Sequence, residues 1–247
     1  MASGRGGARA SVAALVVCAA LALTGCAASA SVRPDTDVRD RPDTADTGSA
    51  PAQTIATDHP VSLVTIGDSI MTGNGLDPEQ AWPVLLADHE KWQLTNLAED
   101  GAGFLSVGDD GGVFADQVAE AELLPDPPSI IVVSASSNDL GEDPDEIEGA
   151  AHSAFASLRA AFPDTLLVGL SAIWGSDDPD EGLAPLNGAV ERAALDEGAQ
   201  WIDIGEPLLG HPELMQDDDV HPTAKGLKVM ARAIEEDLRP FLDHSAH

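Results

Sequence analysis

Hydrophobic and polar positions alternate in blocks from residue 61 onward. Short, nearly continuous apolar runs recur, and each is followed by small or polar residues. Runs of this length, rich in Val, Ile and Leu, are typical of strands that are buried on both faces of a parallel sheet. The pattern predicts five strands, over residues 61–66, 92–97, 129–135, 165–173 and 200–204.

Segments with a helical period lie between these runs. Apolar side chains recur every three or four residues from Ile147 to Phe162, and again from Leu227 to Phe241. Such a stripe indicates a helix with one face packed on a core. We expect helices over 145–162 and 224–241, and others near 79–90, 112–123 and 182–197. Pro83 leaves the start of the first one open, because proline suits only the first turn of a helix.

Five strands that alternate with helices predict an α/β fold, a three-layer α/β/α sandwich with a five-stranded parallel sheet. Right-handed crossovers leave few topologies, of which the flavodoxin-like order 2-1-3-4-5 is favoured. In such sheets, ligands and reactive groups gather beyond the carboxyl ends of the strands. The residues that follow each strand are therefore the first candidates for function.

The first 60 residues lack this alternation. Two arginines precede an apolar stretch, residues 10–23, which is too short to span a bilayer comfortably and is typical of a secretory signal. The stretch ends in Leu-Thr-Gly-Cys at Cys26, which resembles the bacterial lipobox. The resemblance implies a lipoprotein signal peptide over 1–25 and a palmitate-bearing lipid on the Cys26 sulfur. The alternative is a plain signal peptide followed by a chance cysteine.

Residues 26–60 are rich in Ser, Thr, Asp, Pro and Ala, with almost no large apolar side chain. Such a segment cannot bury enough surface to offset chain entropy. We expect a lipid-anchored disordered linker between the membrane and a folded domain at 61–243, or else an unstructured leader without function. With the lipid, the protein would lie on the extracellular face of the cell membrane.

Charge and cysteine content narrow the function further. Twelve Lys and Arg against 43 Asp and Glu give a net charge of −31, which argues against binding of nucleic acid, since phosphates need clustered cations. Both cysteines, Cys18 and Cys26, precede the predicted domain, so it has no disulfide and no cysteine–metal site. Nucleotide-binding glycine motifs and paired metal-ligand histidines are absent as well. We expect no cofactor and no metal. The remaining alternative is a weak cation site in the acidic loops. The sequence does not indicate an oligomeric state.

Candidate chemistry follows the predicted strands. Ser69 comes after the first strand, Gly101 after the second, Asn138 after the third, and His221 lies on the loop into the last helix. Asp218, three residues before His221, can accept the Nδ1–H of the imidazole and leave Nε2 free to take a proton from a hydroxyl. These are the parts of an acyl-transfer site: a serine nucleophile, its base and the group that orients the base.

Donors for an oxyanion are also available at the same edge. The backbone N–H groups of Ser69 and Gly101, with the side-chain amide of Asn138, can converge on the negative oxygen of a tetrahedral intermediate. Two neighbours of Asp218, Asp217 and Asp219, are alternative acids, although the spacing favours Asp218.

The order Gly-Asp-Ser, isolated Gly, Asn-Asp and closing Asp-x-x-His-Pro resembles the blocks of the SGNH (GDSL-type) hydrolase superfamily. The resemblance covers residues 61–243 and implies the SGNH hydrolase fold, a Ser–His–Asp triad, a three-donor oxyanion hole and metal-free ester hydrolysis. Carried over by position, it assigns the nucleophile to Ser69, its partners to Asp218 and His221, and the oxyanion donors to Ser69, Gly101 and Asn138.

Three features qualify the match. Ser136 stands where the family's Gly-x-Asn-Asp block has its glycine, which questions the tight backbone approach behind Asn138. His211 is the one rival base, and we expect no acid partner for it at comparable spacing. Trp174, at the end of the fourth strand, either contacts substrate or packs at the sheet edge.

The sequence thus predicts a serine esterase that acts on carboxylic esters, whether of lipids, short acyl chains or O-acetyl sugars. Its partners would be a small-molecule or glycan ester and, through the anchor, the membrane. The alternative, favoured by Ser136 alone, is a catalytically weak or inactive cell-surface lipoprotein that binds glycan or lipid.

Overall fold

The computed structural model describes residues 55–56 and 60–243. The chain divides into two units, Met1–Thr47 and Gly48–His247, and only the second contains described residues. The predicted signal peptide 1–25, Cys26 and most of the predicted linker therefore lie outside the described part. Among the described residues, no helix combines the length and the apolar character that crossing a membrane requires.

Five parallel strands form the central sheet, in the order β3-β2-β4-β5-β6. This is the order 2-1-3-4-5 predicted from the sequence, and the α/β/α fold class is confirmed. Their bounds are Ser62–Ile66 for β2, Gln93–Asn96 for β3, Ile130–Ser134 for β4, Leu166–Leu170 for β5 and Gln200–Ile202 for β6.

Burial along the strands follows their place in the sheet. Every residue of β4 and β5 is buried, whereas the edge strand β3 is partly exposed along its length. Helices cover both faces of the central strands, so these strands are apolar on both sides. The strand predicted over 165–173 ends at Leu170, because the backbone then leaves the β4 ladder and the Ala172 N–H donates to the Asn187 side chain.

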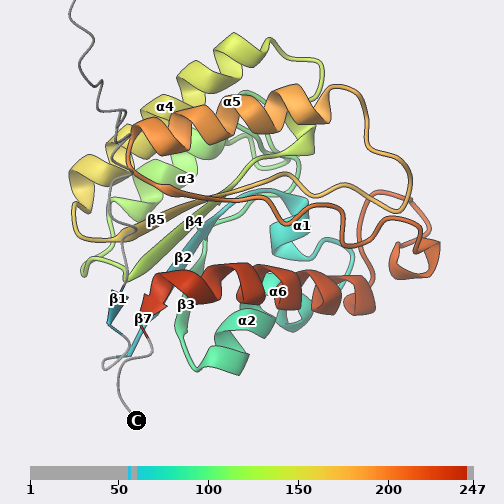
Figure 1. Cartoon of the computed structure of the whole chain (residues 1–247), viewed down its shortest axis with the longest axis horizontal. Coiled ribbons are helices and arrows are strands. Elements are labelled where there is room, and N and C mark those ends of the chain that lie inside the picture. The colour runs from blue at the N-terminus through green and yellow to red at the C-terminus, as the bar shows by residue number, and fades with distance from the viewer. Residues whose placement is uncertain (1–54, 57–59, 244–247) are drawn as a thin grey trace, which may run out of the picture. The chain divides into compact units, whose positions relative to one another are not determined.

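Helices lie on both faces of the sheet (Figure 1). One face carries α3 (Phe114–Ala121), α4 (Pro144–Ala161) and α5 (Leu183–Asp196), and the other carries α2 (Trp82–Glu90) and α6 (Ala224–Leu238). Between residues 60 and 243, four short 3-10 turns complete the connections: η1 (Pro78–Gln80), η2 (Ser137–Asp139), η3 (Pro212–Leu214) and η4 (Arg239–Phe241).

Two prolines explain where the helices differ from the sequence prediction. Pro83 lies in the first turn of α2, where its missing N–H is tolerated, so η1 and α2 replace the single helix expected near 79–90. The last helix was expected to reach residue 241. Pro240 cannot continue an α-helix, so α6 stops at Leu238 and η4 covers the remaining residues, Arg239–Phe241.

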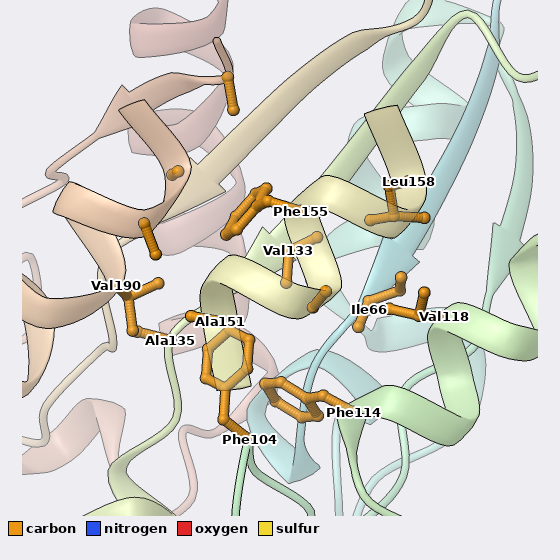
Figure 2. Close-up of a cluster of buried hydrophobic side chains, with 14 of the residues drawn as sticks. Ile66, Phe104, Phe114, Val118, Val133, Ala135, Ala151, Phe155, Leu158 and Val190 are labelled. Carbon is orange, nitrogen blue, oxygen red and sulfur yellow. The ribbon is translucent and has the colours of Figure 1, made fainter. Parts of the chain in front are cut away.

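Alternate side chains of each strand enter two separate cores. Val64 and Ile66 of β2 belong to the core under α3, α4 and α5, while Leu63 belongs to the core under α2 and α6. Figure 2 shows the first core, in which the rings of Phe104 and Phe114 meet edge to face with centroids 5.0 Å apart. Phe104 belongs to the loop after Gly101, so this packing holds a loop of the candidate site against the core.

A two-residue strand, β1 (Ile55–Ala56), pairs in parallel with β7 (Leu242–Asp243). β1 lies inside the segment 26–60 that the sequence predicts to be a linker, and β7 lies at the end of the predicted domain, so the paired strands begin before residue 61. So short a strand has no periodicity, and a sequence pattern therefore cannot reveal it.

Candidate active site

Ser69 is held at the carboxyl end of β2 by the residues just before it. Asp68 is the N-cap of α1 (Ser69–Thr72), and its Oδ1 accepts the N–H of Ile70 at 2.9 Å. The backbone of Gly67 is bound on both sides by the Gln117 side chain, which accepts the Gly67 N–H at 2.9 Å and donates to its carbonyl at 3.0 Å. The strand exit is therefore fixed from α3, and Ser69 becomes the first residue of a short helix.

His221 lies on the loop between η3 and α6. Thr223 caps α6 by accepting the N–H of Gly226, and the His221 carbonyl accepts the N–H of Gln216. Gln216 also donates from its side chain to the carbonyls of Asn74, at 2.8 Å, and Pro222. This amide joins the loop after α1 to the loop of His221, which keeps the two halves of the site together.

The side chains of Ser69, His221 and Asp218 form one hydrogen-bonded chain. The Nε2 of His221 lies 3.0 Å from the Ser69 Oγ, and its Nδ1 lies 2.7 Å from the Asp218 Oδ2. An ionised carboxylate can only accept, so Nδ1 carries the proton and the Nε2 lone pair faces the serine hydroxyl. This geometry suits transfer of the hydroxyl proton to the imidazole.

The carboxylate of Asp218 is held in its ionised form. Its Oδ1 accepts the backbone N–H groups of His221 at 2.9 Å and Val220 at 3.0 Å. The His221 N–H and then the His221 side chain lower the pKa of Asp218 to about 2, with the Val220 N–H adding to the effect. Among the three neighbouring acids, it is Asp218 that reaches the imidazole in the structure.

The three predicted oxyanion donors lie just after β2 and on two neighbouring loops. Within residues 60–243, the backbone N–H groups of Ser69 and Gly101 have no protein acceptor. Gly101 has a φ of 75°, a left-handed conformation that glycine adopts without strain. Asn138 uses one amide hydrogen for the Ala102 carbonyl at 3.0 Å, and an amide carries a second hydrogen.

Asp139 shapes the loop that carries Gly101, a role the sequence did not suggest. Its buried carboxylate accepts three successive backbone N–H groups, from Phe104 at 2.7 Å, Leu105 at 3.0 Å and Ser106 at 2.9 Å. A Cβ on Gly103 would overlap this carboxylate. The Asn-Asp pair of the sequence therefore points in two directions, with Asn138 toward the site and Asp139 into the loop behind it.

Two further positioning residues went unnoticed in the sequence. Gln117 holds Gly67, as described above, and Asp100 accepts hydrogen bonds from the side chains of Thr72 and Asn74. Asp100 thereby links α1 to the loop of Gly101. A polar residue at a buried position of an otherwise apolar helix face was the available signal for Gln117.

Other predicted candidates lie apart from this chain of hydrogen bonds. Trp174 is partly buried and packs against the core under α4 and α5, so the structure supports edge packing. His211 bonds through Nδ1 to Glu213 at 3.0 Å. The expectation that His211 has no acid neighbour was wrong, because Glu213 follows two residues later. Both side chains are exposed, and the imidazole of His211 contacts Glu213 and not Ser69.

One group of potential metal ligands occurs among the described residues, formed by His89, Glu90 and Glu235 of α2 and α6. Glu235 is already bonded to Arg239, and Lys228 and Arg232 line the adjoining 360 Å³ cavity. These cations oppose a divalent ion there, and the group includes no member of the serine site. A second cavity, of 560 Å³, lies beside Asp100 and is lined mainly by polar and acidic residues, including Glu99, whose Oε1 accepts two backbone N–H groups.

Solved structures share this fold at low sequence identity. The psychrotrophic esterase EstA from Pseudoalteromonas sp., whose structure is described as inhibited by monoethylphosphonate, is 18% identical with a TM-score of 0.60, over 72% of this chain and 97% of that chain. A member of the lipolytic G-D-S-L family from Veillonella parvula is 19% identical with a TM-score of 0.56, over 71% and 97%. A family two carbohydrate esterase from Clostridium thermocellum is 16% identical with a TM-score of 0.58, over 75% and 66%.

Among curated protein sequences none matches this chain. The family of GDSL-like lipases and acylhydrolases, however, matches residues 65–229, which is more than half of the chain and includes all the residues of the serine site. This match supports a hydrolase that acts on esters, and the sheet order and the structural neighbours agree with it on the fold. The chain belongs to the GDSL-like lipase/acylhydrolase family.

Proposed function

We propose that the domain is a serine esterase that cleaves carboxylic esters through an acyl-enzyme on Ser69. The observation that supports this most directly is the chain from Ser69 through His221 to Asp218, with bonds of 3.0 and 2.7 Å. Each of these residues comes from the carboxyl edge of the sheet, where α/β folds bind their ligands.

In the proposed reaction, the Oγ of Ser69 attacks the ester carbonyl carbon while its proton passes to Nε2 of His221. Asp218 stabilises the resulting imidazolium. The carbonyl oxygen becomes an oxyanion that accepts the N–H groups of Ser69 and Gly101 and the free amide hydrogen of Asn138. Collapse of the intermediate breaks the ester bond, and the leaving alcohol takes the proton from Nε2. Water then repeats the sequence on the acyl-enzyme and frees the acid.

The proposal is tested with short-chain nitrophenyl esters and a serine-directed phosphonate. Ser69→Ala should reduce kcat to at most about a thousandth of the parent value and abolish the phosphonate adduct on intact-mass spectra. Ser153→Ala is a suitable control, because its hydroxyl is exposed on α4 and bonds only the Gly149 carbonyl within its helix. Equal turnover by Ser69→Ala and the parent would refute the assignment. A folded parent that forms no adduct would favour the binding-protein alternative.

The substrate class we propose is a carboxylic ester of a small alcohol or sugar, or of a lipid. Support comes from the family and from neighbours that are named as an esterase and a carbohydrate esterase. Acyl length and alcohol are resolved by comparing kcat/KM for acetyl to decanoyl nitrophenyl esters with deacetylation of an acetylated oligosaccharide. A clear preference for either series would assign the class.

We also propose that Cys26 carries a lipid and holds the enzyme on the extracellular face of the membrane. The support is the apolar stretch that ends in Leu-Thr-Gly-Cys. Cys26→Ser should move the protein from the detergent phase to the aqueous phase in a phase-separation assay and abolish labelling by radioactive palmitate. Cys18→Ser, inside the apolar stretch, is the matched control. Unchanged labelling of Cys26→Ser would contradict the anchor.

A further inference from the structure

Ser136, which stands where the family block has glycine, makes contacts that join both sides of the candidate site. It is completely buried, two residues beyond β4, and it is the N-cap of η2. Its Oγ lies 2.6 Å from the Oδ2 of Asp68 and 3.0 Å from the carbonyl of Ala102. The same oxygen accepts the backbone N–H of Asn138 at 3.2 Å. One hydroxyl therefore touches the residues next to Ser69 and Gly101, and Asn138 itself.

Counting hydrogens shows how these contacts divide. A serine hydroxyl has one hydrogen, and two acceptors lie within its reach. The carboxylate of Asp68 is at the shorter distance and forms the stronger, charge-assisted bond. The Ala102 carbonyl remains satisfied, because the side-chain amide of Asn138 also donates to it at 3.0 Å. The hydroxyl thus holds Asp68, and the Asn138 amide closes the link to the loop of Gly101.

We propose that Ser136 is a positioning residue for the oxyanion hole, since its hydroxyl sets the spacing between Ser69 and Asn138. This inference rests on the proposed esterase function and deepens it. A glycine could make neither the bond to Asp68 nor the bond to the Asn138 N–H. In this chain the extra hydroxyl therefore takes the place of close backbone packing as the means of aligning the donors.

The expected effect of losing the hydroxyl is on chemistry more than on binding. The Oδ2 of Asp68 and the N–H of Asn138 would both lose a partner, and both flank groups that act on the charge developing in the transition state. Donors of this kind stabilise the transition state much more than the bound ester, so their displacement lowers kcat and leaves KM nearly unchanged. A misplacement of about 1 Å can lower the rate about a hundredfold.

The test compares Ser136→Ala and Ser136→Gly with Ser134→Ala. Ser134 is a buried serine of β4 whose hydroxyl donates only to the neighbouring Ala135 carbonyl, so it controls for loss of a buried hydroxyl. Turnover of a nitrophenyl ester is expressed per active site, counted by phosphonate titration, so that misfolded molecules do not enter kcat. We expect kcat to fall about ten- to a hundredfold in both Ser136 variants, KM to stay within about twofold, and Ser134→Ala to match the parent.

The outcomes separate this inference from the proposed function. If the parent is active and the Ser136 variants have an unchanged kcat, the positioning role alone is overturned. Full activity of Ser136→Gly together with low activity of Ser136→Ala also overturns it, because side-chain size would then decide the rate. An equal loss in Ser134→Ala also overturns it. A parent that neither turns over the ester nor forms an adduct on Ser69 overturns the proposed function, and the positioning role with it.

Discussion

At the residue scale, the candidate site combines two aspartates in opposite environments. Asp218 is half exposed and surrounded by N–H donors, so its pKa is lowered to about 2. Asp68 is buried, and burial raises its pKa, although the Ser136 hydroxyl, the Ile70 N–H and the nearby His221 act in the opposite direction. The two aspartates therefore differ because of their surroundings. Asp218 is suited to stabilise a positively charged imidazole, and Asp68 is suited to act through its hydrogen bonds.

Replacing the carboxylate of Asp218 by an amide should disable the imidazole. The amide of an asparagine at this position can donate to Nδ1, which would leave the hydrogen of His221 on Nε2 and remove the base that faces Ser69. We expect Asp218→Asn to lower kcat about a thousandfold or more. Asp219→Asn is the matched control, because Asp219 has a φ of 57° and asparagine accepts that conformation. Equal activity of the two variants would show that Asp218 is not the partner.

Acid should also weaken the fold through Asp218. A carboxyl whose pKa is lower in the folded than in the unfolded chain stabilises the fold above the unfolded value, and that contribution is lost as pH falls through the folded value. For Asp218 the window runs from the ordinary value of 3.8 down to about 2. Urea unfolding at pH 5 and at pH 2.5 should show the parent losing more stability than Asp218→Asn. The difference should be modest, because the side chain is half exposed. Parallel losses in both proteins would contradict the lowered pKa.

At the element scale, the site is assembled by contacts between segments far apart in the chain. Gln117 of α3 binds Gly67 at the exit of β2, and Gln216 binds the loop after α1 from the loop before α6. Asp139 holds the loop of Gly101 from η2. Each contact satisfies backbone groups that lie outside the regular strands and helices, so the loops of the site are as well defined as the elements that carry them.

Removing the Gln117 amide should test that view. Gln117→Leu leaves the buried N–H of Gly67 without an acceptor, at about 1–3 kcal/mol, while the Gly67 carbonyl keeps the backbone N–H of Glu99 as a donor. We expect a loss of about 1–3 kcal/mol in the free energy of unfolding, measured with urea. Glu120→Leu on the exposed side of the same helix should change it by less than about 0.5 kcal/mol. Similar values for the two variants would mean that the Gly67 backbone is not held by this side chain.

The elements themselves were largely predictable from the sequence, and their contacts were not. Apolar runs located the five strands and the helical period located α4 and α6, because burial imposes a pattern on every residue of a long element. The helix α1 is only four residues long and has no period to detect, although Gly-Asp-Ser indicated the turn that starts it. The proximity of Ser69 and His221 could be predicted because parallel strands bring their carboxyl ends together. Gln117 and Asp100, in contrast, make contacts between segments that only the folded chain brings together.

At the scale of the whole molecule, charge is the dominant property. The chain has a net charge of −31, and an acid-lined cavity lies beside Asp100, next to the loop of Gly101. A surface of one sign raises the local concentration of oppositely charged ligands and lowers that of like-charged ones. Substrate selection should therefore depend on substrate charge before any pocket contact is made.

Esters that differ only in charge should reveal this effect. A cationic aryl ester should have a higher kcat/KM than its neutral isostere, and an anionic one a lower value, in about 10 mM salt. The differences should shrink in about 300 mM salt, since the screening length is about 10 Å already at 0.1 M. Measurement of kcat/KM for the three esters at both concentrations tests the idea. Ratios that do not respond to salt would assign selectivity to local contacts in the site.

The pairing of β1 with β7 has a consequence for how the domain can be rebuilt. Ile55 lies opposite Leu242, so the first and last described segments run side by side, at the strand spacing of about 4.8 Å. Because the two strands are parallel, a peptide of about a dozen residues, long enough to cross back from the end of β7 to the start of β1, would close the domain into a ring. Such a ring can be reopened at an exposed loop such as that of Gly141, which would give a circularly permuted protein with new ends and the same sheet order.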